Sequence, residues 1–216
     1  MKNVLIIGVG RFGHHLCRKM AELGDDIMVV DQDESRIHDL LPLVTSARCG
    51  DCTDPEVLKS LGINGFDLCF VCIGTNFQSS LEITSQLKEM GAKYVISKAT
   101  RDIQAKFLLR NGADEVVYPE RDIAEKTAIK HSANNIFDYI ELPGEFSIFE
   151  IQTPAHWVGK SIAELNIRVK YGVNVFGIRQ GKIINFMPGS DYVFRAGEHL
   201  MVMGRDDDLH KLIRKK

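Results

Sequence analysis

The sequence predicts an α/β fold with a doubly wound parallel sheet, followed by a second, smaller α+β C-terminal lobe. Short apolar segments alternate with helix-compatible segments through the first two-thirds of the chain, which is typical of a parallel sheet with crossover helices. A glycine-rich turn joins the first apolar segment to the first helical one. After residue 132 the pattern changes, and only one strand-helix-strand unit is apparent.

The elements of the first lobe follow from this alternation and from their end signals. We expect strands at Asn3–Ile7, Ile27–Asp31, Ser46–Cys49, Leu68–Ile73, Tyr94–Ser97 and Glu115–Tyr118. We expect helices at Arg11–Leu23, Glu34–Leu41, Pro55–Leu61, Phe77–Met90, Arg101–Asn111 and Glu120–Ser132. Asp54 is an N-cap before a proline at the first helical position, and glycines 24, 62, 91 and 112 stand where helices would end. Residues 1–132 therefore read as a Rossmann-like domain.

The rest of the chain divides into a connector, residues 133–144, and a C-terminal lobe, residues 145–216. Strands are expected in that lobe at Phe146–Gln152, Val173–Arg179, Lys182–Phe186 and His199–Gly204. Short helices are expected at Ser161–Asn166 and Asp206–Lys215. A lobe of this size is small for a substrate-binding domain.

Composition excludes several classes of protein. The chain has 216 residues, of which 44% are hydrophobic and 26% charged, the usage of an ordinary folded domain. Its net charge is −2, and no basic run exceeds the tail Arg214-Lys215-Lys216, so we expect no nucleic-acid partner. Apolar runs such as Val4–Gly10 are far shorter than the roughly 20 residues of a membrane-spanning helix, and no cleavage site follows the first of them. We therefore expect neither a membrane span nor secretion.

Four of the five cysteines have the spacing of a zinc ribbon, but their context does not fit one. Cys49, Cys52, Cys69 and Cys72 have that spacing. Cys69 and Cys72, however, fall in one apolar strand, where residues three apart point to opposite faces. We therefore expect these four, and Cys17, to be small hydrophobic residues in a reducing compartment.

The glycine-rich turn is the first candidate site. Gly8, Gly10 and Gly13, with Arg11 and Phe12 between them, form the G-x-G-x-x-G pattern after a strand and at the start of a helix. Gly8 permits the tight turn, Gly10 lets a pyrophosphate approach the backbone, and Gly13 lets the helix pack closely on the sheet. The phosphates would bind the amides of the helix N-terminus.

The second strand adds a specificity residue. It ends at Asp31, where a carboxylate would bind ribose hydroxyls and repel a 2′-phosphate. An adenine nucleotide such as ATP or ADP, or NAD(H), is therefore favoured over NADP(H).

Further residues at strand ends would line the same crevice, because ligands bind at the carboxyl ends of parallel strands. They are Gly50 and Asp51 after the third strand, Gly74 and Asn76 after the fourth, and Lys98 after the fifth. Each also fits ordinary turn chemistry. Arg11 would reach a terminal phosphate, or be an exposed arginine at a helix start. Glu120 would be part of the site, or an acid favoured by the dipole of its helix.

Catalytic motifs are missing from the sequence. A dehydrogenase needs an acid or base beside the hydride acceptor, and the seven histidines form no catalytic motif. Serine-hydrolase, zinc-protease and Walker patterns are also absent. No catalytic chemistry is therefore visible in the sequence, although a scattered active site would escape such a search. A small NAD-dependent oxidoreductase and an NAD(H) redox sensor stay open as alternatives.

The combination of motifs resembles the RCK (regulator of conductance of potassium) family, in particular the cytosolic regulatory subunits of bacterial Ktr/Trk-type potassium uptake systems. The resemblance covers residues 3 to 214. It is carried by Gly8-Val9-Gly10-Arg11-Phe12-Gly13, Asp31, Gly50-Asp51, Ile73-Gly74, Lys98-Ala99, Gly112-Ala113-Asp114, Tyr118-Pro119-Glu120 and the small second lobe.

The resemblance implies a regulator and not an enzyme. It implies dimers that assemble into a ring, an octamer in related proteins, beneath an integral-membrane potassium channel or transporter subunit. The protein would be cytoplasmic and peripheral on the inner face of the membrane. ATP, ADP or NAD(H) would bind with Arg11 on phosphate and Asp31 on ribose, and Glu120 would join a Mg²⁺ or Ca²⁺ site between paired subunits.

A second ligand is implied for the C-terminal lobe. Residues 165–175 are similar to the segment with which some of these lobes bind cyclic di-AMP at their dimer interface, with Arg168 and Asn174 at the matching positions. The family usually has aspartate where this chain has Asn166. The same segment is plain helix, turn and strand in lobes that bind nothing.

Overall fold

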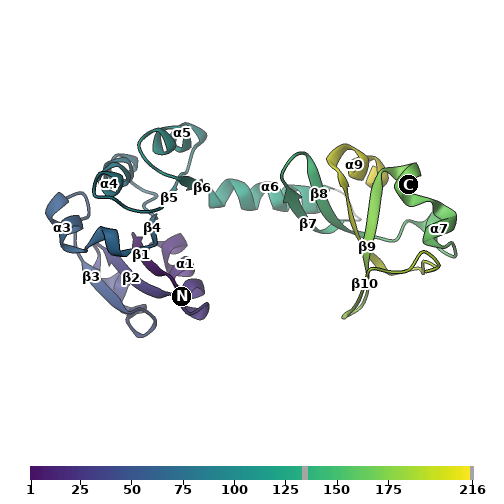
Figure 1. The fold of residues 1–216 in the computed structure, drawn as a ribbon, viewed down its shortest axis with the longest axis horizontal. Helices are drawn as coiled ribbons and strands as arrows, with labels where there is room; N and C mark the ends of the chain where they lie inside the picture. Colours follow the sequence, from purple (N-terminus) through teal and green to yellow (C-terminus); the bar gives the residue numbers. More distant parts are fainter. Residues whose placement is uncertain (133–135, 215–216) are drawn as a thin grey trace. The chain divides into compact units, whose positions relative to one another are not determined.

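The computed structural model describes residues 1–132 and 136–214 and divides into two compact units, Met1–Asp122 and Ile123–Lys216 (Figure 1). The division falls inside helix α6 (Pro119–Ser132), whereas we expected it after residue 132. The difference arises because Ile129 of α6 packs against the core of the second unit.

The first unit is built on a six-stranded sheet with the order β3-β2-β1-β4-β5-β6. All neighbouring strands are parallel, and the order 3-2-1-4-5-6 is that of the Rossmann fold, so the predicted fold class is confirmed. The strands are β1 (Asn3–Ile7), β2 (Asp26–Asp31), β3 (Ser46–Cys49), β4 (Leu68–Val71), β5 (Val95–Lys98) and β6 (Glu115–Val117).

The helices of this unit lie close to their predicted positions. They are α1 (Arg11–Glu22), α2 (Glu34–His38), α3 (Pro55–Ser60), α4 (Phe77–Glu89), α5 (Asp102–Arg110) and α6, with short 3₁₀ turns η1 (Leu41–Leu43) and η2 (Ile63–Gly65). The helix predicted at Glu34–Leu41 is shorter than expected. Pro42 lies in the first turn of η1, and a proline lacks the amide that a continuing helix would need.

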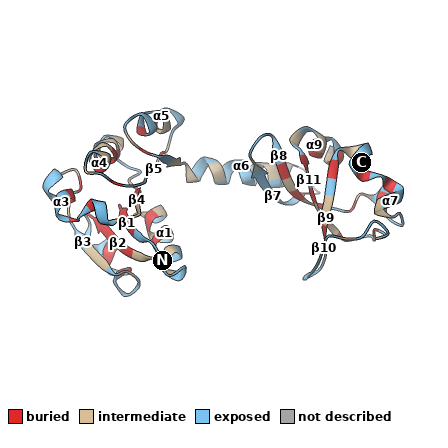
Figure 2. Cartoon of the chain, in the orientation of Figure 1, coloured by how far each residue is buried: buried red, intermediate tan, exposed pale blue. Residues whose placement is uncertain are grey.

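Two apolar cores cover the two faces of the parallel sheet, seen as red segments along the strands in Figure 2. Cys69 packs in one core and Cys72 in the other, as their positions in the sequence predict. Burial raises the pKa of Cys69 and of Cys72 to about 12, so both thiols are protonated and unreactive near neutral pH. Cys17 and Cys52 are also buried, while Cys49 is exposed.

The second unit contains a five-stranded antiparallel sheet with the order β10-β9-β11-β8-β7. The strands are β7 (Ile136–Leu142), β8 (Phe146–Gln152), β9 (Val173–Gln180), β10 (Ile183–Phe186) and β11 (His199–Arg205). Strand β7 lies in the segment that we expected to be a connector. Its alternation is broken by a bulge between Ile136 and Asp138, which obscures the two-residue period in the sequence. Residues 133–135 of the expected connector lie outside the described residues.

Short helices complete this unit: η3 (Ala155–Trp157), α7 (Ile162–Leu165), α8 (Ile167–Tyr171) and α9 (Asp206–Arg214). Trp157, at the end of η3, is fully buried in the core of this unit. Helix α8 was not predicted. Asn166 separates it from α7 with a left-handed backbone, φ 44° and ψ 50°, which asparagine tolerates better than most residues. None of the helices in the described part of the chain is long and apolar enough to cross a membrane.

Candidate functional site

Two glycines of the turn between β1 and α1 are required by the fold. Gly8 has φ +88°, and a Cβ there would lie 3.2 Å from Cγ1 of Ile73. A Cβ on Gly13 would lie 2.1 Å from the carbonyl oxygen of Gly8, far inside van der Waals contact. The first turn of α1 therefore packs directly on the backbone of the glycine turn, which is the close packing that the motif predicted.

Gly10 differs from its neighbours because the fold does not require it. Its backbone is extended, with φ −62° and ψ −170°, and a Cβ there would meet no described atom within 4 Å. Gly10 is the N-cap of α1, and within the described chain no side chain caps this helix end. The site therefore presents a helix N-terminus whose backbone a ligand can approach closely, an arrangement suited to phosphate.

Asp31 ties the end of β2 to the glycine turn. Its Oδ2 accepts the Val9 amide at 2.8 Å, and its Oδ1 accepts the Asp33 amide at 2.9 Å. The residue is only 7% exposed. Each carboxylate oxygen can accept a further hydrogen bond, so the predicted contact with a ribose remains open to it. The structure adds a positioning role that the sequence did not reveal.

Arg36 was not a predicted site residue, but it lies beside Asp31 at the end of β2. Its NH1 lies 3.7 Å from Oδ1 of Asp31, and its Nε lies 3.3 Å from a carboxylate oxygen of Asp33. Asp33 is the N-cap of α2 and accepts the Ser35 amide. A sequence signal did exist, because an N-cap at residue 33 puts residue 36 in the first helical turn, beside the end of β2.

The polar residues after β3 and β4 make local turn contacts. Oδ1 of Asp51 accepts both the amide and the hydroxyl of Thr53, at 2.9 and 2.8 Å, and these bonds lower the pKa of Asp51 below its usual value. Asn76 is the N-cap of α4 and accepts the Ser79 amide at 3.3 Å. Gly50 donates its amide to the carbonyl of Asp31 at 3.0 Å. These contacts hold the loops at the carboxyl end of the sheet, and a role in ligand binding stays a prediction.

Three other predicted residues, Glu120, Phe12 and Gly74, lie around the ammonium group of Lys98. The Nζ of Lys98, at the end of β5, donates to Oε1 of Glu120 at 2.7 Å and lies 5.8 Å from the centre of the Phe12 ring. A Cβ on Gly74 would be 3.5 Å from the same Nζ. The Lys98 hydrogen bond, with a smaller contribution from the charge of Arg11, lowers the pKa of Glu120. Residues from the glycine turn, β5 and α6 thus meet at one place.

One chain alone does not fit a divalent cation at Glu120. The carboxylate is held by an ammonium at 2.7 Å, not by other oxygen ligands. Among residues 1–132 and 136–214, no group of three or more His, Cys, Asp and Glu side chains is arranged to hold a metal. Hard cations such as Mg²⁺ need several oxygen ligands, so a cation there would need oxygens from elsewhere.

In the second unit, the two residues predicted for a second ligand flank one turn. Arg168 lies on α8 and Asn174 on β9, and both are exposed. Gly172 between them has φ +69°, and a Cβ there would lie 2.6 Å from Oδ2 of Asp208. The turn therefore packs closely against α9, with Arg168 and Asn174 on either side of it.

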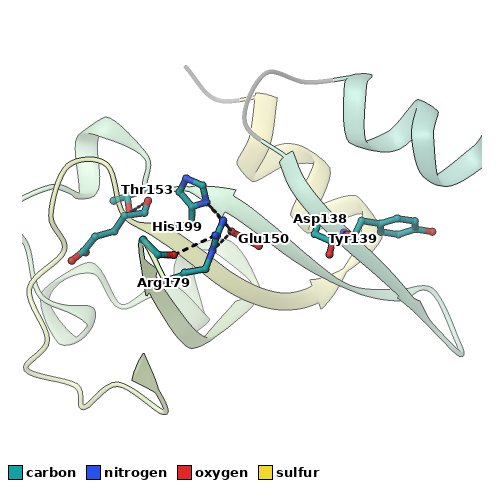
Figure 3. A network of polar contacts seen from close by, with 8 residues as sticks. Asp138, Tyr139, Glu150, Thr153, Arg179 and His199 are labelled. Atoms are coloured by element: carbon teal, nitrogen blue, oxygen red, sulfur yellow. Dashed lines mark hydrogen bonds and ion pairs between the residues drawn. The ribbon is translucent and has the colours of Figure 1, made fainter. Parts of the chain in front are cut away.

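The same unit contains a polar network across its sheet (Figure 3). Oε1 of Glu150 on β8 accepts from Nε of Arg179 on β9 at 2.7 Å, and Nδ1 of His199 on β11 lies 2.7 Å from that oxygen. The Phe137 ring of β7 stacks on His199 with 3.8 Å between ring centres. These contacts link four of the five strands. The polar side chains of Glu150, Arg179 and His199 are hydrogen-bonded to one another.

Comparison with known proteins matches both units. The family model for the TrkA-N domain matches residues 4–119, and the model for the TrkA-C domain matches residues 146–216. The chain is 38% identical to Ktr system potassium uptake protein C of Bacillus subtilis (strain 168), over 97% of this chain and 95% of that protein. It is 33% identical, with the same coverage, to Ktr system potassium uptake protein A of that organism.

The fold also matches a solved structure. The crystal structure of the GsuK RCK domain superposes with a TM-score of 0.67 at 20% identity. The match covers 98% of this chain and 47% of that one, so this chain spans about half the length of the solved chain. At this identity, the likeness supports the fold.

Proposed function

The chain belongs to the family of proteins that combine a TrkA-N and a TrkA-C domain, and on this premise we propose that it is a nucleotide-binding regulatory subunit that gates a membrane potassium channel or transporter. The observation that carries the proposal is the glycine turn. Gly10 leaves the N-terminus of α1 open to a ligand although the fold would accept a side chain there. Binding of a phosphate at this helix N-terminus would explain why the position is a glycine.

The potassium system enters the proposal through the names of the relatives, which are Ktr system potassium uptake proteins. We place the protein in the cytoplasm, on the inner face of the membrane, with its dimers assembled into a ring beneath an integral-membrane subunit. No hydride-transfer chemistry is assigned, because the sequence has no recognisable motif for the acid or base that such chemistry needs.

Gating by a nucleotide requires a difference in affinity. ATP and ADP shift the ring between two shapes only if one of them binds one shape better, and tenfold discrimination corresponds to about 1.4 kcal/mol. The third phosphate is the chemical difference between them, and exposed Arg11 in the glycine turn is the cation placed to detect it. Arg11 is therefore the proposed discriminating residue.

Calorimetric titration of the purified chain with ATP, ADP and NADH, in the presence of Mg²⁺, tests the proposal. We expect saturable binding of ATP and ADP with different affinities, and competition between them. NADH binding that ATP does not displace would instead favour an NAD(H) redox sensor, and substrate-dependent oxidation of bound NADH would favour an oxidoreductase.

In the Arg11→Ala variant we expect the difference in affinity between ATP and ADP to become smaller, because the cation that meets the third phosphate is gone. The same titrations measure it. An unchanged difference in affinity would show that Arg11 does not discriminate between the two nucleotides.

Cyclic di-AMP is a second candidate ligand, for the C-terminal lobe. Arg168 and Asn174 stand exposed on either side of a closed turn, and a cyclic dinucleotide offers phosphates to an arginine. We expect Arg168→Ala to weaken cyclic di-AMP binding by about tenfold or more, since a hydrogen bond to a charged group is worth about 1.5–3 kcal/mol. Calorimetry measures this, with Arg205→Ala, an exposed arginine on β11, as the matched control. Equal losses in both variants would contradict a specific site.

A further inference from the structure

Glu150, Arg179 and His199 form a polar triangle on the sheet of the second unit (Figure 3). Nδ1 of His199 lies 2.7 Å from Oε1 of Glu150 and also 2.7 Å from Nη2 of Arg179. A ring nitrogen either carries a proton and donates, or has a lone pair and accepts. A proton on Nδ1 therefore suits the carboxylate and opposes the guanidinium, whereas a lone pair does the reverse. His199 can make one of these two hydrogen bonds at a time.

The triangle lies on the face of the sheet opposite the apolar core. Phe149 and Ile151, on either side of Glu150 in β8, are buried in that core, and residues of a strand alternate between the two faces. The side chains of Glu150, His199 and Arg179 are 13%, 21% and 32% exposed. Water screens charges at such positions less than at a fully exposed surface. A change of charge on the imidazole therefore acts strongly on both partners.

Two further acidic residues around the imidazole accept hydrogen bonds of their own. Glu198, the preceding residue, accepts the hydroxyl of Tyr192 at 2.7 Å, and Oδ1 of Asp138 on β7 accepts the amide of the next residue at 2.9 Å. The ladders place uncharged side chains beside the triangle, Gln152 of β8 opposite the histidine and Ile184 of β10 opposite the arginine. Among the described residues of these strands, the carboxylate and the guanidinium of the triangle are the charged groups in contact with the imidazole.

The imidazole also holds the start of β7. The ladder between β7 and β8 pairs Ile136 and Asp138 but skips Phe137, the extra residue of the bulge. The Phe137 ring instead stacks on His199, with 3.8 Å between ring centres and 26° between ring planes. Because β8 lies between β7 and β11 in the sheet, the ring reaches across a strand to make this contact. A residue that the ladder leaves unpaired is thus fixed through its side chain.

From this geometry we infer that His199 is a proton-controlled latch for the start of β7. With a neutral imidazole, Nδ1 accepts a hydrogen bond from Arg179; with a charged imidazole, it donates to Glu150. A charged imidazole also attracts the face of the Phe137 ring, as cations do within about 6 Å of a ring centre. Because histidine ordinarily changes charge between about pH 5 and 8, acidification tightens the start of β7. This regulation lies in the C-terminal lobe and is independent of the proposed nucleotide site.

Hydrogen exchange of the full chain, followed by mass spectrometry for residues 136–142 at about pH 5.5 and about pH 7.5, tests the latch. Labelling times are scaled for the intrinsic exchange rate at each pH, so that protection factors are compared. We expect protection to be about two- to fivefold higher at the lower pH, the fold-change that a cation–π contact near the surface gives. His199→Gln should remove this difference, because glutamine does not titrate. Equal protection at both pH values in the wild type, or lower protection at the acidic one, overturns the inference.

Variants of the two partners distinguish the latch from a general effect of pH. Glu150→Gln removes the charge that favours a charged imidazole, so the gain in protection should move to lower pH. Arg179→Gln removes the opposing charge, so the gain should move to higher pH. Shifts of both variants in the same direction contradict the triangle. His156→Gln, at an exposed histidine whose Nε2 lies 3.3 Å from the Tyr171 hydroxyl, is the matched control and should behave like the wild type.

The comparison needs folded variants, which thermal unfolding of each variant checks. If His199→Gln does not fold, Phe137→Leu takes its place, because it removes the stacked ring from a partly exposed position. The difference in protection between the two pH values should vanish there as well. A difference that persists in either variant overturns the inference.

Discussion

Replacing Gly13 with alanine is expected to destabilise the first unit by about 3 kcal/mol or more, at the upper end of the usual cost of overpacking. The added Cβ would lie 2.1 Å from the carbonyl oxygen of Gly8. That oxygen belongs to backbone and has little freedom to move, because the Gly8 amide is itself bonded to the carbonyl of Val30 at 2.8 Å. Denaturant unfolding of the variant and the wild type measures the loss.

Gly10→Ala is the matched control for this prediction. Its Cβ would meet no described atom within 4 Å, and its φ of −62° suits alanine, so stability should fall by about 1 kcal/mol at most, the cost of a poorer N-cap. Nucleotide affinity should nevertheless fall at least tenfold, because the methyl group would stand between the phosphates and the helix N-terminus. Similar stability losses in both variants, or an unchanged nucleotide affinity in Gly10→Ala, would contradict this division of roles.

Asp31→Ala is expected to lower both stability and nucleotide affinity. The substitution leaves the buried Val9 amide without its acceptor and removes the bond to the Asp33 amide. An unsatisfied buried amide costs about 1–3 kcal/mol, so we expect a total loss of about 2–4 kcal/mol in the free energy of unfolding. Asp31→Asn should lie in between, since one amide oxygen can still accept while its NH₂ group faces a donor.

A carboxylate at the other end of the same sheet provides the control. Asp67 accepts the Asn3 amide at 3.0 Å and binds Lys93, but it lies before β4, away from the glycine turn. Asp67→Ala should lower stability by less than Asp31→Ala, because Asn3 and Lys93, the partners of Asp67, are exposed to water. It should leave nucleotide affinity unchanged. If Asp67→Ala reduced affinity as much as Asp31→Ala did, the effect of Asp31 would be a general loss of stability.

The first unit was predictable in detail because its signals are local. Alternating apolar segments, the cap at Asp54 with Pro55, and glycines after helices each act within a few residues, and strands β1 and β3 have the predicted bounds. The second unit was less predictable for the same reason. Strand β7 carries a bulge, and α8 begins at a left-handed asparagine, so in both places the regular period that identifies an element is interrupted.

The candidate site, too, was predictable from the sequence only in part. The sequence by itself determined the glycine turn, the carboxylate at the end of β2 and the family of the chain. These features depend on backbone conformation and motif spacing, which residues close together in the sequence determine. Only the tertiary structure decided that Asp31 holds the Val9 amide and that Lys98 holds Glu120, pairs that are each 22 residues apart in the chain. Which side chains meet at strand ends depends on the order of strands in the sheet and on the packing of the helices between them, and these are set by the whole core.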